Sequence, residues 1–587
     1  MSGWADDSRG PGIVRSSGVS SGIPSGVSVS SVDDDGPPDT VTGATEALTT
    51  GSAAPQAQRA AALDALAHER FDVLVVGGGI TGVGALLDAT SRGLRAALVE
   101  CDDLAVGTSS RSSKLIHGGL RYLEQFRFGL VREALAERAT LLRIAGHLVH
   151  LETFAVPLYG SPLRVPYMGA GLTLYGLLGA GFPAYQTPST ARRNIPSLRP
   201  ERLRGALTYR DGVEDDARLV IAVCRTAVAR GAVAATRVRA TGLVRRDGRV
   251  AGVEATDLVS GEHMVISATS VIDATGATGG ASGPFAAAGA AVEVLPSLGV
   301  HLVVDRERIP ASGGMTITIP GRVFFVIPWG RRWIIGTTDH PYDGSADRPT
   351  APGAAVDEVL DNLNHTLDVG LTRADILATF AGVRPLAATR DRSTVTASRE
   401  HVINEPLPGL VAVRGGKYTT YRRIAADAVD VALGSRAKAL PSATATLALV
   451  GAPAVGVIAR GGAPGAGSSL AVDPAVIASL RSRYGTETDA LLALGAQRGL
   501  LGRLHPELDH MEVEVAWAVE QELALSLDDI LARRLRVAIE SRDHGASIAA
   551  RTAAIVAPAL GWDEARQADE VRRYTASSAV EYGVPAP

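Results

Sequence analysis

The chain has 587 residues, 46% of them hydrophobic and 20% charged, an ordinary composition for a globular protein that buries a large core. This length predicts two or three domains. The formal net charge of −4 gives no overall attraction for nucleic acid, and two cysteines, Cys101 and Cys224, are too few for a disulfide framework or a zinc site.

Residues 1–68 are rich in Ser, Gly, Asp, Ala and Thr. Such a segment buries too little apolar surface to offset the entropy of ordering it, so we predict a disordered tail with one short helix at AQRAAALDALAHER. The start, MSGWADDSRG, lacks a basic region followed by an apolar one, and no window reaches about 18 strongly apolar residues. We therefore expect neither a secretory signal nor a membrane-spanning helix.

From residue 71 the pattern becomes that of a strand, a turn, a helix and a second strand. FDVLVV predicts a buried strand, GGGITG a turn, VGALLDATSR a helix and RAALVE the next strand. In this setting Gly77 permits a tight turn, Gly78 and Gly79 let a pyrophosphate approach the backbone, and Gly82 lets the helix pack on the strand.

Two further features make this unit a predicted dinucleotide site. The helix N-terminus offers N–H groups to phosphates. Glu100 ends the second strand, 23 residues after Gly77, where a carboxylate accepts ribose hydroxyls. These residues alone do not decide between NAD and FAD.

The next segment, TSSRSSKLIHGGLRYL at residues 108–123, combines hydroxyls and cations with a Gly-Gly pair. Small hydroxylated residues can wrap a long cofactor and donate hydrogen bonds to it, which favours FAD, because an NAD-dependent dehydrogenase would not need this segment. The candidate cofactor-binding residues here are Thr108, Ser109, Ser110, Ser113, Lys114 and His117.

Later elements complete the predicted domain order. VFFVIPW and RWIIGTTD flank Gly330-Arg331 as a hairpin, and strands mix with helices to residue 435. Residues 436–470 read as a linker and 471–587 as helices, one beginning at a capping box of Ser526 and Asp529 and running through ILARRLRVAIE. The pair Asp215-Asp216 is interpreted as the acidic start of a helix rather than as paired catalytic carboxylates.

In combination, VVGGGITGVGALLDATSRG, SSKLIHGGLRYL, GVEDDARLV, FAGVRPL and VRGGKYTTYR resemble the FAD-dependent, quinone-linked glycerol-3-phosphate dehydrogenases. These enzymes belong to the D-amino-acid-oxidase-like flavoenzymes, and the resemblance covers residues 70–545. It implies an α/β fold with a Rossmann-like FAD-binding domain and an interleaved mixed-sheet substrate domain at 69–435. A C-terminal helical cap domain follows at 471–587.

The resemblance also implies roles for single residues. Glycerol 3-phosphate would be bound by Arg121, Tyr122, Arg384, Arg399 and Lys417, and the catalytic candidates are His117, His301 and Arg384, with the base left unassigned. Further cofactor contacts would come from Thr275, Gly276, Gly415, Gly416, Lys417, Thr419 and Thr420, and no metal is expected. The sequence departs from the family in having Ala277-Thr278 after the glycine turn and Ser297-Leu298 before Gly299.

The electron acceptor implied by the family is a membrane quinone, reached by a cytoplasmic enzyme bound peripherally to the membrane. The uncharged stretch at 165–191 is interpreted as a core or pocket-cap segment, and RRLRVAIESR as the candidate interfacial helix. Two alternatives stay open, an oxidase that reduces oxygen to hydrogen peroxide and a flavin-binding protein without turnover. A homodimer is also left open.

Overall fold

The structure, a computed structural model, describes residues 55–119, 126–278, 285, 294–319, 322–387, 401–453 and 472–586. The expected tail up to residue 54 and residues 454–470 of the expected linker lie outside this part of the chain, as do Arg121, Tyr122 and Arg399. Contacts divide the chain into Met1–Ser52 and Ala53–Pro587, and only the second unit is described here.

The first sheet has a parallel centre, in the order β7-β2-β1-β10-β18, with β17 antiparallel at one edge and β8 and β9 extending from β10. Helices α3 (Ile80–Ser91), α8 (Asp216–Ala229) and α10 (Tyr421–Leu433) share one apolar core with Val73 and Val75 of FDVLVV. Phe71, Leu74 and Val76 lie in a second core, so apolar residues follow one another in this strand because both of its faces are buried. The strands are β1 Arg70–Val76, β2 Ala96–Val99, β7 Val233–Ala235, β8 Val238–Arg246, β9 Arg249–Asp257, β10 His263–Asp273, β17 His401–Leu407 and β18 Leu410–Gly415.

The second sheet is mixed, in the order β15-β11-β14-β13-β12-β4-β6-β3, with β16 on β11 and β5 on β6. The predicted hairpin is confirmed as β13 and β14. The strands are β3 Leu115–Ile116, β4 Val149–Tyr159, β5 Ala184–Gln186, β6 Leu203–Glu214, β11 Val294–Asp305, β12 Gly314–Ile319, β13 Arg322–Trp329, β14 Arg332–Gly336, β15 His340–Pro341 and β16 Ile376–Ala387. The helices of this part are α5 Phe128–Ile144, α6 Arg164–Tyr175, α7 Pro188–Asn194 and α9 Gly353–Thr366.

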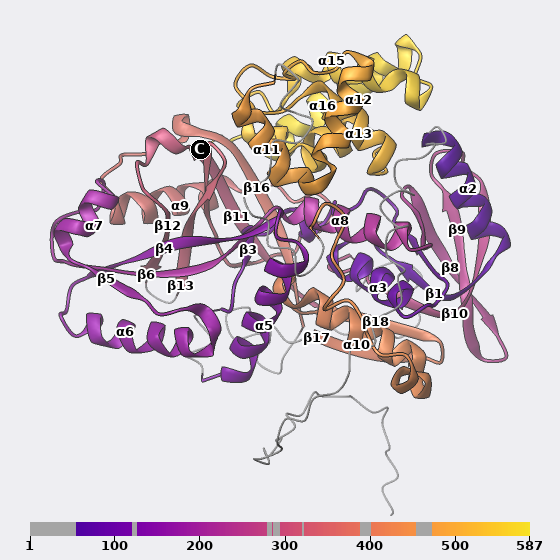
Figure 1. Cartoon of the computed structure of the whole chain (residues 1–587), viewed down its shortest axis with the longest axis horizontal. Helices are drawn as coiled ribbons and strands as arrows, with labels where there is room; N and C mark the ends of the chain where they lie inside the picture. Colours follow the sequence, from indigo (N-terminus) through magenta and orange to yellow (C-terminus); the bar gives the residue numbers. More distant parts are fainter. Residues whose placement is uncertain are drawn as a thin grey trace, which may run out of the picture. The chain divides into compact units, whose positions relative to one another are not determined.

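The two sheets are interleaved along the chain, because the chain enters the second sheet at β3, returns to the first at β7, leaves it at β11 and returns again at β17. In Figure 1, strands β4, β6, β12 and β13 of the second sheet lie on the left, and strands β1, β8, β9 and β10 of the first sheet lie on the right. The predicted class, an α/β fold with an interleaved mixed-sheet domain and a C-terminal helical domain, is confirmed.

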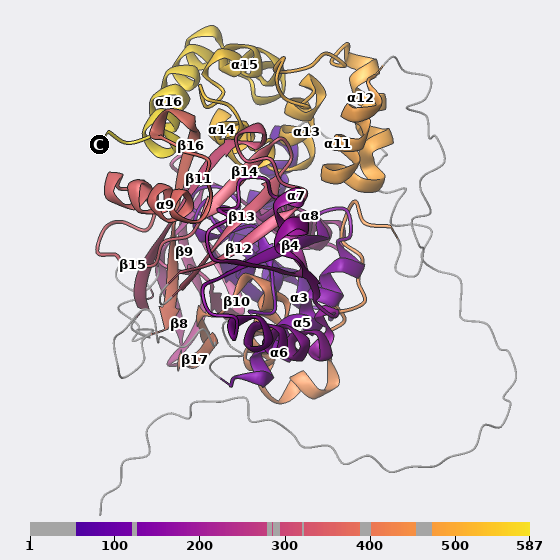
Figure 2. The same ribbon diagram turned by 90° about the vertical axis from the view of Figure 1, so that its left-hand side faces the viewer.

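The C-terminal helices gather at one end of this unit, as both ribbon views show (Figures 1 and 2). They are α11 Pro474–Tyr484, α12 Thr488–Arg498, α13 Glu512–Gln521, α14 Val537–Glu540, α15 Ala546–Leu560 and α16 Glu564–Tyr582, with a π-helix, η10, at Asp529–Arg534.

The helix predicted to run from Ser526 through ILARRLRVAIE is shorter than expected. At its start the Asp529 N–H donates to Ser526 Oγ as the capping box predicts, while the Asp529 carboxylate accepts from the Ser526 hydroxyl and the Leu525 N–H. The helix stops before Arg536, whose φ of 63° interrupts it. Because Arg533, Arg534 and Arg536 are buried, the interpretation of RRLRVAIESR as a membrane-facing helix is also wrong.

The short helix expected near the end of the tail is confirmed as α2, Pro55–His68. Its Leu66 is fully buried, and the Arg59 guanidinium lies 2.7 Å from the Asp257 carboxylate. This helix is therefore not part of a disordered segment, because one apolar and one charged side chain anchor it on the first sheet.

The turn after β1 determines where the site lies. Gly77 has a φ of 116°, and a Cβ there would come within 2.6 Å of the Ala274 carbonyl oxygen. A Cβ at Gly82 would overlap the carbonyl oxygen of Gly77. Both positions therefore need glycine, and together they bring the N-terminus of α3 against the end of β1.

We predict that Gly82→Ala lowers the melting temperature of the protein, because α3 must move off the turn, with an overpacking cost of about 1–3 kcal/mol. Gly129→Ala in α5 is the matched control, since a Cβ there meets no atom within 4 Å. Thermal unfolding followed by circular dichroism measures both variants. Equal melting temperatures for the two would contradict the close packing described for Gly82.

Candidate cofactor and substrate site

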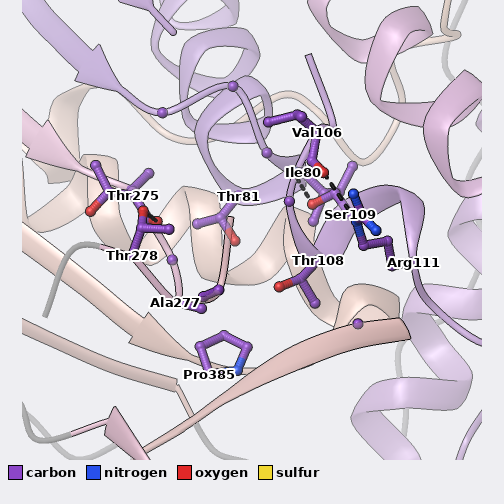
Figure 3. Close-up of a pocket in the computed structure, with 18 of the residues that line it drawn as sticks. Ile80, Thr81, Val106, Thr108, Ser109, Arg111, Thr275, Ala277, Thr278 and Pro385 are labelled. Carbon is purple, nitrogen blue, oxygen red and sulfur yellow. Dashed lines mark hydrogen bonds between the residues drawn. The ribbon is translucent and has the colours of Figure 1, made fainter. Parts of the chain in front are cut away.

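A single cavity of about 950 Å³ opens at the carboxyl ends of β1 and β2. Its wall is drawn from segments far apart in the sequence, as Figure 3 shows for Thr81 of α3, Thr108 and Ser109 of the hydroxyl segment, Thr275 after β10, and Pro385 of β16. Both sheets therefore contribute to one space, large enough for an extended cofactor with a small substrate beside it.

Glu100 lies directly beside the glycine turn. The Gly78 N–H donates to its Oε2 at 2.6 Å, and the Asp102 N–H donates to its Oε1 at 2.7 Å. Burial raises the pKa of this carboxyl above its usual value, although the Gly78 hydrogen bond opposes the rise. The turn and the acid expected to act on a ribose thus meet in the cavity wall.

The hydroxyl segment contributes Thr108, Ser109 and Ser113 to the wall. Ser109 Oγ accepts a hydrogen bond from the Ile80 N–H at 3.0 Å, and Thr108 Oγ1 donates to the Val383 carbonyl at 2.6 Å. The segment therefore connects the start of α3 with β16.

Two candidates in this segment lie elsewhere. Ser110 is not part of the wall, and its carbonyl oxygen accepts a hydrogen bond from Lys114 Nζ at 2.6 Å. Lys114 is fully buried, lies 2.6 Å from the Asp216 carboxylate and does not line the cavity. Burial and the nearby Arg536 lower the pKa of Lys114 to about 8.

His301 lines the cavity although only 2% of its surface is exposed. Its Nε2 lies 2.9 Å from Ser113 Oγ, and its ring stacks on Phe380 with centroids 4.6 Å apart. Burial, with the charges of Arg384 and Lys114, lowers the pKa of His301 well below its usual value. The imidazole is therefore neutral at pH 7.

Arg384 extends from β16 across β11, where a Cβ at Gly299 would overlap its guanidinium. The guanidinium donates to Thr337 Oγ1 at 2.9 Å and to the Thr338 carbonyl at 3.2 Å, and it lies 3.6 Å from Asp339. These contacts fix its direction at the cavity wall, where part of the side chain stays exposed.

The second Gly-Gly motif lies at the end of β18. Gly415, Gly416, Lys417 and Thr419 line the cavity, whereas Thr420 lies outside its wall. Thr419 Oγ1 lies 3.3 Å from the backbone nitrogen of His117, another residue of the wall. Thr275 and Gly276 line the cavity as well, and Gly82 lies behind the turn.

Sequence reasoning missed several cations of the wall. Among the described residues that line the cavity, seven are arginine or lysine and three are carboxylates, but Arg111, Arg237, Arg348 and Arg414 each pair with a carboxylate at or behind the wall. Their partners come from distant elements, so no local pattern marks them, except that Arg111 lies inside the hydroxyl segment. The missed cations are Arg111, Arg237, Arg239, Arg348 and Arg414. Within the described residues, no group of three His, Cys, Asp or Glu side chains is placed to hold a metal ion.

Family models match most of the chain. The model "FAD dependent oxidoreductase" matches residues 72–422, and "C-terminal domain of alpha-glycerophosphate oxidase" matches residues 442–567. The chain therefore belongs to the FAD-dependent oxidoreductases and, within them, to the glycerol-3-phosphate dehydrogenase family.

The relatives that support this family cover nearly the whole chain. "Glycerol-3-phosphate dehydrogenase 2" of Mycobacterium tuberculosis is 43% identical over 89% of this chain and 90% of its own. The mitochondrial glycerol-3-phosphate dehydrogenase of Homo sapiens is 34% identical over 85% and 72%. The structure of the glycerol-3-phosphate dehydrogenase of Bacillus halodurans complexed with FAD has a TM-score of 0.72 at 26% identity, covering 89% of this chain and 97% of its own.

FAD is the cofactor of this family, and the residues present fit it. The α3 N-terminus and the glycine turn offer N–H groups for a pyrophosphate, and Glu100 lies where a ribose would follow. The hydroxyl segment and the second Gly-Gly motif continue the wall from there.

We predict that His301 makes the stability of the protein pH-dependent. The unfolded His301 takes up a proton as the pH falls below about 6.5, whereas the folded residue stays neutral, so its contribution is complete above this pH and is lost below it. Between pH 7 and pH 5 the wild type should lose on the order of 1–2 kcal/mol more stability than His301→Gln. Denaturant unfolding at both pH values measures this difference, and parallel losses in the two proteins would show that His301 is not neutral when folded.

Proposed function

We propose that the chain oxidises sn-glycerol 3-phosphate to dihydroxyacetone phosphate, with FAD as the hydride acceptor and a membrane quinone as the next acceptor. The observation that carries the proposal is that one cavity combines the dinucleotide turn with Arg384, His117, His301 and Lys417. The names of the relatives at 43% and 34% identity support the choice of substrate.

The substrate phosphate is assigned to Arg384 and Lys417. A dianion in a partly dry cavity needs cations, and the planar guanidinium suits phosphate oxygens best. Arg384 comes from β16 of the second sheet and Lys417 from the segment after β18 of the first. A phosphate bound by both would place the substrate between the two sheets.

Oxidation at C2 removes a hydride and the hydroxyl proton. Bound FAD supplies the acceptor for the hydride. We assign the proton to His117, because it lines the cavity and is half-buried. His301 is less suited, since its Nε2 is hydrogen-bonded to Ser113 and its Nδ1 has no exposed surface. Its proposed role is to hold Ser113 in the cavity wall.

Arg384→Ala and Lys417→Ala should each raise the KM for glycerol 3-phosphate about 10- to 100-fold, the loss expected for a charged hydrogen bond. Arg373→Ala is the matched control, because that arginine pairs with Asp357 at the surface and does not line the cavity. Steady-state kinetics with an artificial dye as acceptor measure the effect. Glycerol, which lacks the phosphate, should be oxidised equally by the wild type and both variants, and an unchanged KM in both would remove the phosphate assignment.

Anaerobic mixing of the wild type with glycerol 3-phosphate tests turnover itself. Loss of the visible flavin absorbance is expected, because the reduced flavin loses this band. A lasting yellow colour would instead indicate a flavin-binding protein that does not act on this substrate.

The proposed membrane contact rests on α6 and the residues that follow it. Leu163, Tyr167 and Leu174 share one face of the helix by their spacing, and Leu177 follows within the π-helix η2, Gly176–Ala180. Leu163 is 76% and Leu177 68% exposed, whereas Leu172 and Tyr175 on the other side are buried. These four exposed residues are called the α6 face. Their exposure shows that this face of residues 165–191 is not part of the core.

Charge around the α6 face favours an anionic lipid surface as its partner. Residues 153–200 contain Arg164, Arg192, Arg193 and Arg199 and no Asp or Glu. Arginine is thus the only charged residue type in this stretch of sequence, and helices that lie in the membrane interface combine exposed apolar side chains with basic residues. Among the described residues, no helix is long and apolar enough to span a membrane.

We predict that Tyr167→Ser/Leu177→Ser lowers binding to vesicles of anionic phospholipid about tenfold or more, since each apolar side chain contributes roughly 1.5–3 kcal/mol when fully buried. Val259→Ser/Val580→Ser is the control, because these side chains are also exposed but belong to the turn between β9 and β10 and to α16. Co-sedimentation measures binding. Equal losses in both double variants would contradict a specific role for the α6 face.

The same vesicles, loaded with quinone, separate the proposed acceptor from oxygen. An oxidase is the second candidate, because residues 442–567 match a domain described from alpha-glycerophosphate oxidase. Quinone reduction with little hydrogen peroxide is the expected result. One peroxide formed per glycerol 3-phosphate consumed, with quinone present, would establish the oxidase instead.

A further inference from the structure

The C-terminal helical domain contacts the cofactor site through buried ion pairs. We propose that this domain positions residues 101–114, called here the cofactor segment, in the conformation that binds FAD. The inference needs only the cofactor of the family and does not depend on the substrate or the electron acceptor. The amino-acid composition of this domain gives no indication of its function.

The cofactor segment has little regular structure to fix its shape. Apart from the 3-10 turn η1, Thr108–Ser110, it contains no helix or strand. Ala105 and Lys114 have φ values of 62° and 56°, which non-glycine residues seldom adopt. Its conformation must therefore be determined largely by contacts with other elements.

The first contact holds the start of the segment. Asp103 is fully buried, and its carboxylate lies 2.5 Å from Arg533 Nε and 2.5 Å from Arg534 Nη1, both in η10. Arg534 Nη2 also donates to Asp103 Oδ1 at 2.7 Å. Asp102, beside Asp103, lines the cavity, so this contact lies next to the cofactor wall.

The second contact holds the middle of the segment. Arg536, directly after η10, donates to the Ser110 carbonyl at 3.1 Å and to Asp216 Oδ1 at 2.6 Å. Asp216 also binds Ser112 Oγ at 2.7 Å and Lys114. Arg536 therefore contacts the cofactor segment directly at Ser110 and, through Asp216, at Ser112 and Lys114.

The third contact holds the cavity side of the segment. Glu581 of α16 lies 2.6 Å from Arg111 and 3.2 Å from Arg348, and both arginines line the cavity. Arg348 also reaches Asp528 at 3.0 Å, and Asp528 pairs with Arg533 at 2.9 Å. The first and third contacts are thus joined in one network.

These contacts should act on FAD affinity. Without these contacts the segment would be less ordered in the protein without FAD, and binding of FAD would have to order it. The conformational entropy lost in this ordering raises the dissociation constant of FAD, but it does not change the reaction of the enzyme once FAD is bound. A positioning role therefore predicts a large effect on FAD affinity and a small effect on kcat at saturating FAD.

The test is Glu581→Gln in the full chain, which preserves the volume of the side chain and removes its charge. Glu522→Gln is the matched control, because Glu522 is also a buried C-terminal carboxylate paired with an arginine, Arg218 of α8, at 2.7 Å. Arg218 neither belongs to the cofactor segment nor lines the cavity. Both variants thus weaken the attachment of the C-terminal domain, but only one weakens the hold on the segment.

FAD is removed from each protein, and rebinding is followed by quenching of flavin fluorescence, with melting temperatures measured on the same apoproteins. Glu581→Gln should raise the FAD dissociation constant about tenfold or more, and Glu522→Gln less than about threefold, with kcat at saturating FAD within about threefold of the wild type in both. Equal weakening of FAD binding by both variants, or by neither, would overturn the proposal.

If Glu581→Gln does not fold, Asp528→Asn gives the same test at the middle of the network, because Asp528 joins Arg348 to Arg533 and does not line the cavity. It should weaken FAD binding more than Glu522→Gln does. The reverse order would overturn the proposal.

Discussion

The contact between the glycine turn and α3 is the constraint from which the rest of the site follows. Only glycine at 77 and 82 lets the helix N-terminus meet the end of β1. Because β2 and β10 pair with β1 in parallel, their carboxyl ends meet at the same edge, and Glu100 and Thr275 follow there. The cavity then lies where the parallel centre of the first sheet faces the second sheet.

The cost of burying charge determines much of what surrounds that edge. Asp215 caps α8 by accepting from the Arg218 N–H, as the interpretation of Asp215-Asp216 as a helix start expected. Asp216 does more, because it pairs with the buried Lys114 and Arg536, and these cations lower its pKa against the effect of burial. The acidic helix start is therefore also the counter-charge for Lys114 at the end of the cofactor segment and for Arg536 beside it.

Local patterns carried the parts of the fold and site that could be predicted. The glycine turn, the hairpin at Gly330 and the cap at Ser526 each depend on residues within about ten positions of one another, so spacing alone reveals them. The pair of Arg111 and Glu581 joins residues 470 positions apart, and nothing in either local sequence indicates its partner. The exposure of the α6 face could not be predicted either, because the apolar composition of a helix does not show whether another element of the fold covers it.

The buried side of α6 shows why this segment is helical although it exposes large apolar residues. Tyr175, at its end, accepts a hydrogen bond from the Gly118 N–H and donates one to Asp211, both at 2.8 Å. Arg138 pairs with Asp211 at 2.6 Å and donates to the Gly179 carbonyl at 3.1 Å. Polar contacts on the inner side therefore anchor the helix and leave its outer side uncovered. The same tyrosine holds Gly118, which follows His117 of the cavity wall, so the α6 segment and the wall are joined by buried hydrogen bonds.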